Sequence, residues 1–306
     1  MYHNNHSGYE KAIAVNSLQA WMLASRPKTL SGAIVPVMIG LTAAYTDCNS
    51  EIPFQWLPAV LCLLFALVMQ VVANFFNDYF DFLKGNDDET RLGPKRACSM
   101  GWITPRAMQK ALIITVIFAC SIGLPLIFFG GWEMILVGLF CVLFCMLYTT
   151  HLSYWGLGDV LVLVFFGIVP VCICYYLQLH TITLQVFMVS VACGLVIDTL
   201  LMVNNYRDIE NDIKSGKKTL VVRLGKFGGR MLYLLCGGMA SIIGGVFIFY
   251  GQLMAFFLPL LYLALHVSTY RKMVKIDHGK ELNVVLGETS RNMLIYGILV
   301  SIGMLL

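Results

Sequence analysis

Nine long apolar runs divide this chain, and they constrain its fold more than any other feature of the sequence. A window of about 19 residues, close to the length of a helix that crosses a bilayer, locates them. Their approximate limits are 30–46, 57–77, 108–130, 133–149, 160–178, 182–203, 229–250, 252–270 and 292–306. The last run is short, so we expect its helix to begin earlier, near Leu286, with Arg291 reaching the membrane surface. The runs predict an all-α membrane protein with nine transmembrane helices.

The chain has too few charged residues for a water-soluble surface. Only 12% of its residues are charged and 58% are apolar, whereas a soluble domain has roughly 25% charged residues. This composition excludes a disordered chain and an ordinary soluble globule. We therefore expect a single integral-membrane domain over residues 1–306, in which residues 1–20 form a polar cytoplasmic N-terminus. Its surroundings are the lipid bilayer, and we expect no nucleic-acid partner.

The positive charges lie on one side of this predicted topology. All 21 Lys and Arg residues fall in the N-terminal segment or in the loops after the second, sixth and eighth runs. Cytoplasmic loops carry the excess of Lys and Arg in membrane proteins. The pattern predicts a cytoplasmic N-terminus and, with nine spans, a C-terminus outside. We expect the cytoplasmic (inner) membrane of a bacterium as the location.

A first group of amide and carboxylate side chains follows the second apolar run. If the helix continues past residue 80, Asn74, Asn77, Asp78 and Asp81 share one of its faces, because they are spaced by three and four residues. The sixth run ends in a similar way. There a continuous helix would stack its polar side chains at intervals of four: Asn204, Asp208 and Asp212. A basic loop follows each group.

The two groups predict a binding site at the cytoplasmic surface. Like charges on one helix face repel, so a cation must offset them. Mg²⁺ prefers hard carboxylate and amide oxygens and is usually shared with substrate phosphates, while the basic residues nearby suit the phosphate oxygens. The alternative for each group is a solvated helix end that pairs with loop cations. Two groups with the same layout favour the binding site.

The sequence around these groups resembles the UbiA superfamily of intramembrane prenyltransferases. The resembling segments are Asn77-Asp78-x-x-Asp81 with Asp87, and Asp208-x-x-x-Asp212. The flanking segments are similar to the branch that prenylates 1,4-dihydroxy-2-naphthoate in menaquinone biosynthesis: Arg26 to Leu30, Asn77 to Gly85, Arg91 to Arg96, Gly156 to Asp159, Asn204 to Asp208, Lys218 to Leu220, and Leu282 to Leu286. The resemblance extends from about Trp21 to the end of the sequence.

The resemblance implies a fold and a reaction. It implies nine helices around a central cavity that opens to lipid, with Mg²⁺ and a polyprenyl diphosphate near the cytoplasmic side. The acceptor would be 1,4-dihydroxy-2-naphthoate, which loses its carboxyl group as it is prenylated. The sequence departs from the family at two points. Gly85 stands where the family has a further acid, which leaves Asp87 to take that place, and the loop before Gly156 lacks a basic residue expected on the acceptor side.

Candidate site residues follow from the residue types and the resemblance together. The catalytic candidates are Asp78, Asp81, Asp208 and Asp212. The candidates for holding Mg²⁺ are Asn77, Asp78, Asp81, Asp87, Asn204, Asp208 and Asp212. The candidates for binding the diphosphate are Lys28, Lys84, Arg91, Lys95, Arg96 and Arg207. We expect Lys214, Lys217 and Lys218 to lie on the anionic lipid surface instead.

Two further carboxylates have two interpretations each. Asp159 directly precedes an apolar run, so it is either an N-cap of the next helix or a part of the acceptor pocket. Asp198 lies inside the sixth run, where a carboxylate is costly and needs a partner or a role. It either makes a structural hydrogen bond or faces the acceptor.

Two other functions compete with this hypothesis. A related prenyltransferase acting on 4-hydroxybenzoate or another aromatic acceptor would use the same acidic groups. A cation-coupled secondary transporter would also need acidic residues, but transporters place their sites near the bilayer midplane. Here the acids lie at one membrane surface beside cations that suit phosphate, which favours the enzyme.

Overall fold

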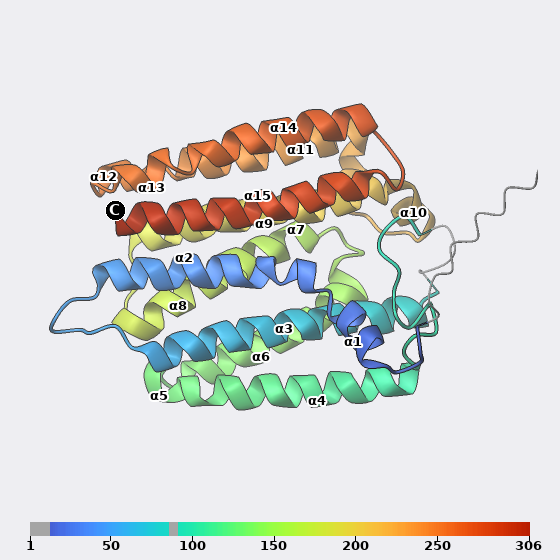
Figure 1. The fold of residues 1–306 in the computed structure, drawn as a ribbon, viewed down its shortest axis with the longest axis horizontal. Coiled ribbons are helices and arrows are strands. Elements are labelled where there is room, and N and C mark those ends of the chain that lie inside the picture. The colour runs from blue at the N-terminus through green and yellow to red at the C-terminus, as the bar shows by residue number, and fades with distance from the viewer. Residues whose placement is uncertain (1–12, 86–90) are drawn as a thin grey trace, which may run out of the picture.

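The computed structural model describes residues 13–85 and 91–306, and this part of the chain is helical (Figure 1). The helices run along the long axis of the molecule. The segments are α1 (Leu18–Ser25), η1 (Pro27–Thr29), α2 (Ser31–Asp47), α3 (Trp56–Leu83), α4 (Pro105–Gly123), η2 (Leu124–Leu126), α5 (Ile127–Gly130), α6 (Glu133–Leu147), η3 (Tyr148–Leu152), α7 (Gly158–Val162), η4 (Leu163–Ile168), α8 (Val169–Leu179), α9 (Leu184–Arg207), α10 (Ile209–Lys214), α11 (Leu220–Ile243), α12 (Val246–Phe249), α13 (Leu253–Phe257), α14 (Leu260–Ile276) and α15 (Leu282–Leu305).

Six helical stretches in the described part of the chain are long and apolar enough to cross a membrane. They are α3, α4 to α5, α7 to α8, α9, α11 to α12, and α13 to α14. A seventh is possible if α1 and α2, which are bent by 48° relative to each other, form one span. The predicted count of nine is therefore not confirmed. The helix α6 has only 15 residues, and α15 is not among the six although it has 24.

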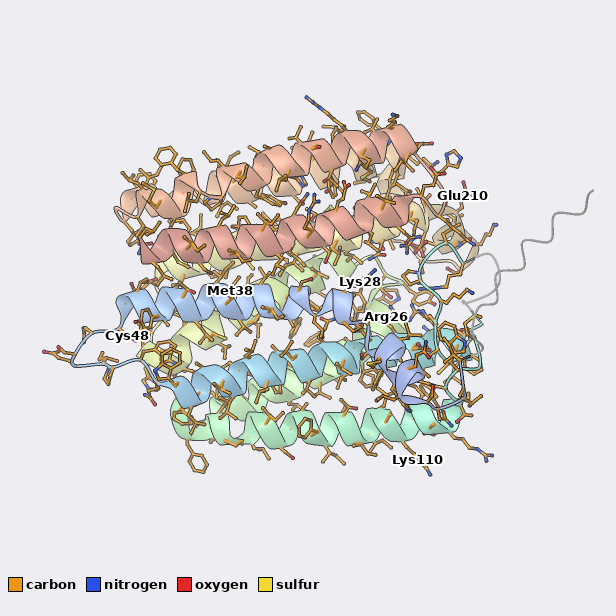
Figure 2. The ribbon with its side chains drawn as sticks, in the orientation of Figure 1. Arg26, Lys28, Met38, Cys48, Lys110 and Glu210 are labelled. Atoms are coloured by element: carbon orange, nitrogen blue, oxygen red, sulfur yellow. The ribbon has the colours of Figure 1, made fainter. Side chains whose placement is uncertain are left out.

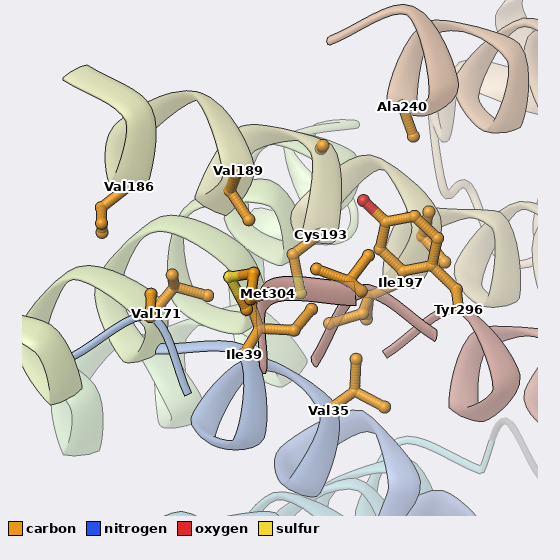
Figure 3. Close-up of a cluster of buried hydrophobic side chains, with 14 of the residues drawn as sticks. Val35, Ile39, Val171, Val186, Val189, Cys193, Ile197, Ala240, Tyr296 and Met304 are labelled. Atoms are coloured by element: carbon orange, nitrogen blue, oxygen red, sulfur yellow. The ribbon is translucent and has the colours of Figure 1, made fainter. Parts of the chain in front are cut away.

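The helix α9 forms the centre of the bundle. It contacts α2, α7, α8, α11 and α15, and buried apolar side chains surround it (Figure 3). Val35 and Ile39 come from α2, Val171 from α8, and Tyr296 from α15. Outward-facing side chains on the other helices are apolar as well, which suits a lipid environment. This arrangement fixes the end of α9, and thus the second acidic group, relative to its neighbours.

The two ends of the bundle differ in charge. Arg26, Lys28, Lys110 and Glu210 lie toward one end, while Cys48 lies at the other (Figure 2). The short helices α1 and α10 lie at the charged end (Figure 1). The loops that the sequence predicts on one side of a membrane thus meet at one end of the molecule.

Candidate active site

The first polar group lies on one continuous helix, as predicted. The helix α3 continues to Leu83, so Asn74, Asn77, Asp78 and Asp81 are all helical. The Asn74 amide donates to the Ser25 carbonyl at 2.9 Å and to the Thr29 hydroxyl at 3.0 Å. Asn74 therefore fastens the segment between α1 and α2 to α3, while Asn77 lines a cavity described below.

The two carboxylates of α3 hold the basic loop that follows it. The fully buried Asp78 accepts hydrogen bonds from the backbone N–H groups of Ala97 and Cys98, each at 2.9 Å. Asp81 forms a buried ion pair with Arg96, with 2.5 Å between the Arg96 Nη2 and the Asp81 Oδ2. The loop that carries three of the predicted diphosphate-binding residues is thereby placed directly over the acidic face of α3.

The second polar group is not on one continuous helix, and this part of the prediction is wrong. The helix α9 ends at Arg207, and Asp208 leaves the helical conformation before α10 begins. Backbone hydrogen bonds still join Asp208 to Asn204 at 3.0 Å and Asp212 to Asp208 at 2.8 Å. The four-residue spacing of the three side chains therefore persists across the break.

Arg207 turns back to hold Asp208. Its Nε and Nη2 donate to the two carboxylate oxygens at 2.8 and 2.6 Å, and its Nη1 donates to the Asn283 side-chain oxygen at 2.8 Å. The amide of Asn283 in turn donates to the Leu92 carbonyl at 2.9 Å. A Cβ atom at Gly93 would lie 2.8 Å from the Arg207 Nη2, so this glycine allows the loop to cover the guanidinium. Arg207 thus links α9, α15 and the loop after α3.

Asp212 connects the two polar groups electrostatically. Its pKa is raised to about 6, mainly because the side chain is buried. Lys217 lowers it, and the carboxylates of Asp208 and Asp81 raise it. Lys217, which we expected on the lipid surface, lies 3.7 Å from the Asp212 carboxylate. The ends of α3 and α9 therefore bring Asp81, Asp208 and Asp212 into one charged cluster.

The remaining predicted cations are either exposed or bonded to backbone carbonyls. Lys28 and Lys95 are exposed, and the Arg91 Nε donates to the Pro94 carbonyl at 3.0 Å. Lys84 donates to the Thr150 carbonyl at 2.7 Å. Asp87 lies outside the described residues.

An apolar cavity of about 550 Å³ lies below the charged cluster. Its polar lining includes Thr29, Gln70, Asn77 and Asn204, of which Asn77 and Asn204 lie in the last two turns of α3 and α9. Elsewhere its walls are apolar and aromatic, with Phe65, Phe144, Phe165, Phe166 and Tyr148 among them. The cavity suits an elongated apolar molecule with a polar head at the charged end.

Asp159 and Asp198 lie behind the wall of this cavity. Asp159 is in the first turn of α7, whose N-cap is Leu157, so the N-cap interpretation is wrong. Both its carboxylate oxygens, and Oδ1 of Asp198, are buried without a hydrogen-bond partner among the described residues. The two carboxylates interact with each other and with Tyr148, which lines the cavity.

Two residues that contact the loops around the site, Arg223 and Tyr154, were not predicted from the sequence. Arg223 on α11 donates to the Trp155 carbonyl at 2.7 Å and the Lys218 carbonyl at 3.1 Å. It supplies a cation to the loop before Gly156, which has none of its own. The ring of Tyr154 lies against the ammonium groups of Lys84 and Lys217. Both contacts join segments far apart in the sequence, so no local pattern could indicate them.

The donor set fits a Mg²⁺ ion that is shared with a phosphate. No three His, Cys, Asp or Glu side chains within residues 13–85 and 91–306 are close enough to hold a metal ion by themselves. Mg²⁺ in proteins is often held by one or two carboxylates, with phosphate oxygens and waters as its other ligands.

These features define an all-α membrane protein with an apolar cavity that leads to a cluster of carboxylates, amides and cations. The chain belongs to the UbiA prenyltransferase family, whose model matches residues 33–296.

Two relatives share the name 1,4-dihydroxy-2-naphthoate octaprenyltransferase. The protein from Escherichia coli strain K12 is 37% identical over 238 residues, which cover 75% of this chain and 76% of the relative. The protein from Haemophilus influenzae is 33% identical over 317 residues, which cover 97% and 99%. Both alignments extend over most of each chain.

Solved structures of more distant relatives share the fold. A UbiA homologue from Aeropyrum pernix K1 has a TM-score of 0.67 at 15% identity and covers 89% of this chain and 96% of its own. A UbiA homologue from Archaeoglobus fulgidus, bound to GPP and Mg²⁺, has a TM-score of 0.61 at 16% identity and covers 92% and 99%. At such low identity the similarity concerns the fold alone.

Proposed function

We propose that this protein transfers a polyprenyl group from polyprenyl diphosphate to 1,4-dihydroxy-2-naphthoate, with loss of carbon dioxide, to form demethylmenaquinol in menaquinone biosynthesis. The observation that carries the proposal is the apolar cavity of about 550 Å³ that ends at Asn77 and Asn204 beside the charged cluster. A polyprenyl diphosphate has the same two parts, a long apolar chain and a charged head. The names of the relatives support the choice of acceptor.

The diphosphate and the metal ion would bind at the charged cluster. Asn77, Asp81, Asn204, Asp208 and Asp212 would hold Mg²⁺, with Asp87 as a further candidate. Asp78 contributes by fixing the loop at Ala97 and Cys98. Lys28, Lys84, Arg91, Lys95, Arg96 and Arg207 would bind the diphosphate oxygens. Mg²⁺ bound there would offset the negative charge that develops on the leaving diphosphate.

The reaction begins with cleavage of the allylic C–O bond. Both electrons of this bond leave with the diphosphate, and the prenyl chain becomes an allylic cation. Aromatic rings attract cations through their faces, and Phe144, Phe165 and Phe166 line the cavity that would receive the cation. The apolar walls also exclude water, which would otherwise trap the cation as an alcohol.

The naphthoate ring then attacks the cation at the ring carbon that bears the carboxylate. The new C–C bond forms there, and the bond to the carboxylate breaks to release carbon dioxide and restore aromaticity. This step requires no strong base for removal of a ring proton. Asp159 and Asp198 are the candidates for the acceptor side, because both act electrostatically on Tyr148, whose side chain lines the cavity.

The topology belongs to the same proposal. We infer nine spans, with α2, α6 and α15 crossing the membrane beside the six longer stretches, a cytoplasmic N-terminus and a C-terminus outside. Polar side chains of α15 form hydrogen bonds inside the bundle. For example, the Asn292 amide donates to the Thr269 hydroxyl at 2.9 Å. Such pairing allows a less apolar helix to cross the membrane. The location is the inner membrane of a bacterium.

The decisive experiment follows the carboxyl carbon of the acceptor. Purified protein is incubated with Mg²⁺, a polyprenyl diphosphate and 1,4-dihydroxy-2-naphthoate labelled at the carboxyl carbon. We expect a prenylated product without label and labelled carbon dioxide. Retention of the label would refute decarboxylation and favour a reaction of the 4-hydroxybenzoate type. Ion-coupled uptake into vesicles without prenyl transfer would favour the transporter.

A further inference from the structure

The ring of Tyr154 lies where two basic loops meet. The ammonium group of Lys84, at the end of α3, lies 4.0 Å from the ring centroid, and that of Lys217, which follows α10, lies 5.3 Å from it. Cations at such distances from an aromatic ring are attracted by the negative charge of its face. One side chain thus gathers a cation from each of the two loops that flank the charged cluster.

The backbone around Tyr154 is held firmly against the second of these loops. The Lys218 N–H donates to the Tyr154 carbonyl at 3.0 Å, and Arg223 donates to the carbonyls of both Trp155 and Lys218. Gly156 has a positive φ of 78°, and a Cβ atom there would lie 2.2 Å from the Lys218 carbonyl oxygen. Only glycine allows this approach, so these contacts hold the backbone of residues 154–156 against Lys218.

Both lysines have a second contact, and that of Lys217 is with a carboxylate of the charged cluster. Lys217 lies 3.7 Å from the Asp212 carboxylate, and Lys84 donates to the Thr150 carbonyl at 2.7 Å. Two ammonium groups that share one ring repel each other, and an anion between them would relieve that repulsion. The diphosphate of the substrate is an anion of this kind.

We propose that Tyr154 is a positioning residue for the diphosphate, because its ring holds Lys84 and Lys217 together beside the carboxylate cluster. The inference rests on the proposed function, since it assigns the two cations to the diphosphate of the prenyl donor. Tyr154 acts through the lysines and does not itself contact the reacting atoms. The ring face, and not the hydroxyl group, carries this role.

The test measures binding of inorganic diphosphate with Mg²⁺ to the purified full-length protein by titration calorimetry. We expect Tyr154→Leu to weaken binding about tenfold, the effect of losing two cation–ring contacts. Tyr154→Phe keeps the ring face and should bind within about twofold of the original protein. Tyr250→Leu removes an exposed tyrosine that follows α12, at the opposite end of the bundle, and serves as the matched control.

Tyr154→Leu is also made in a protein that carries Lys84→Met and Lys217→Met. This comparison distinguishes the loss of lysine positioning from a general disturbance of the fold. There Tyr154→Leu should weaken binding no further. An equal loss in both backgrounds, unchanged binding in the single variant, or no diphosphate binding by the original protein would each overturn the inference. Because the probe is inorganic diphosphate, the result is independent of the acceptor. If the label experiment fails while Tyr154→Leu behaves as expected, the proposed function is refuted and the positioning role stands.

Discussion

Replacement of Asp208 by Asn tests whether the paired charges in the site serve both stability and catalysis. Asp208 accepts two hydrogen bonds from Arg207, whose side chain is only 2% exposed. Asn has nearly the same shape but no charge. Its oxygen can still accept one hydrogen bond from Arg207, while its NH₂ group faces another donor. The substitution therefore leaves the buried Arg207 guanidinium without a neutralising charge and with one hydrogen-bond acceptor fewer.

The expected loss in free energy of unfolding follows from how deeply Arg207 and Asp208 are buried. Removal of one partner of a fully buried ion pair typically destabilises a protein by about 3–5 kcal/mol. Asp208 is 25% exposed, and Arg207 retains its hydrogen bond to Asn283. We therefore expect the free energy of unfolding to fall by about 2 kcal/mol, which for a chain of 306 residues corresponds to a fall in unfolding temperature of roughly 3 °C. Turnover should fall at least about a hundredfold, because stabilisation of the leaving diphosphate is lost.

Two measurements on detergent-purified protein check this expectation, namely the unfolding temperature and the rate of prenyl transfer at saturating donor. Asp277→Asn is the matched control, because Asp277 also pairs with an arginine, Arg230, but is 39% exposed. The control should lose less than about 1 kcal/mol and keep its turnover. If Asp208→Asn retained both the unfolding temperature and the turnover of the original protein, our reasoning about the site would be refuted.

Three further predictions concern the site, the topology and the response to pH. Asp81→Ala should also reduce turnover at least about a hundredfold in the same transfer assay; near-normal activity would exclude Asp81 from the site. In intact cells, and in a protein that also carries Cys48→Ser because Cys48 lies at the end of the bundle predicted to be outside, an impermeant thiol reagent should label Gly251→Cys but not Glu210→Cys, and the opposite pattern would invert the topology. The hydrogen bond from Tyr206, together with Lys226 and Arg230, lowers the pKa of Asp277, so its stabilisation should be full above about pH 4 and disappear as the pH falls through the lowered value. The acid dependence of unfolding should therefore be weaker in Asp277→Asn, and an unchanged dependence would contradict this.

The sequence predicted the helices well because apolar runs of this length have few alternatives in a membrane protein. Every predicted run is helical in the structure. The number of spans was harder to predict, because length and apolarity do not show which side chains face protein. On α15, the polar side chain of Asn292 lowers the apolarity of the helix but bonds to Thr269 inside the bundle. The run of 133–149 forms only the 15-residue helix α6, which is shorter than a typical membrane-spanning helix.

The site was predictable where its spacing is local and unpredictable where contacts are long-range. The polar face of α3 follows from intervals of three and four residues. The break at Asp208 does not, because it accompanies the contact of Arg207 with Asn283 on another helix. Asp78 caps backbone amides about twenty residues away, which no local spacing could indicate. The neighbours of Asp159 in the sequence left an N-cap and a part of the acceptor pocket as alternatives, and only the fold shows that it is buried in the first turn of α7.

The ion pairs of the charged cluster imply how its two ligands should arrive. Asp81, Asp208 and Asp212 each already have a cationic partner within the chain. A free diphosphate would bring excess negative charge to a balanced cluster, and a free Mg²⁺ would bring excess positive charge. A magnesium diphosphate brings nearly balanced charge. Its Mg²⁺ can bind the carboxylates while its phosphate oxygens bind the Arg and Lys side chains that those carboxylates release. We therefore expect strong positive cooperativity, in which each ligand binds tightly only when the other is present.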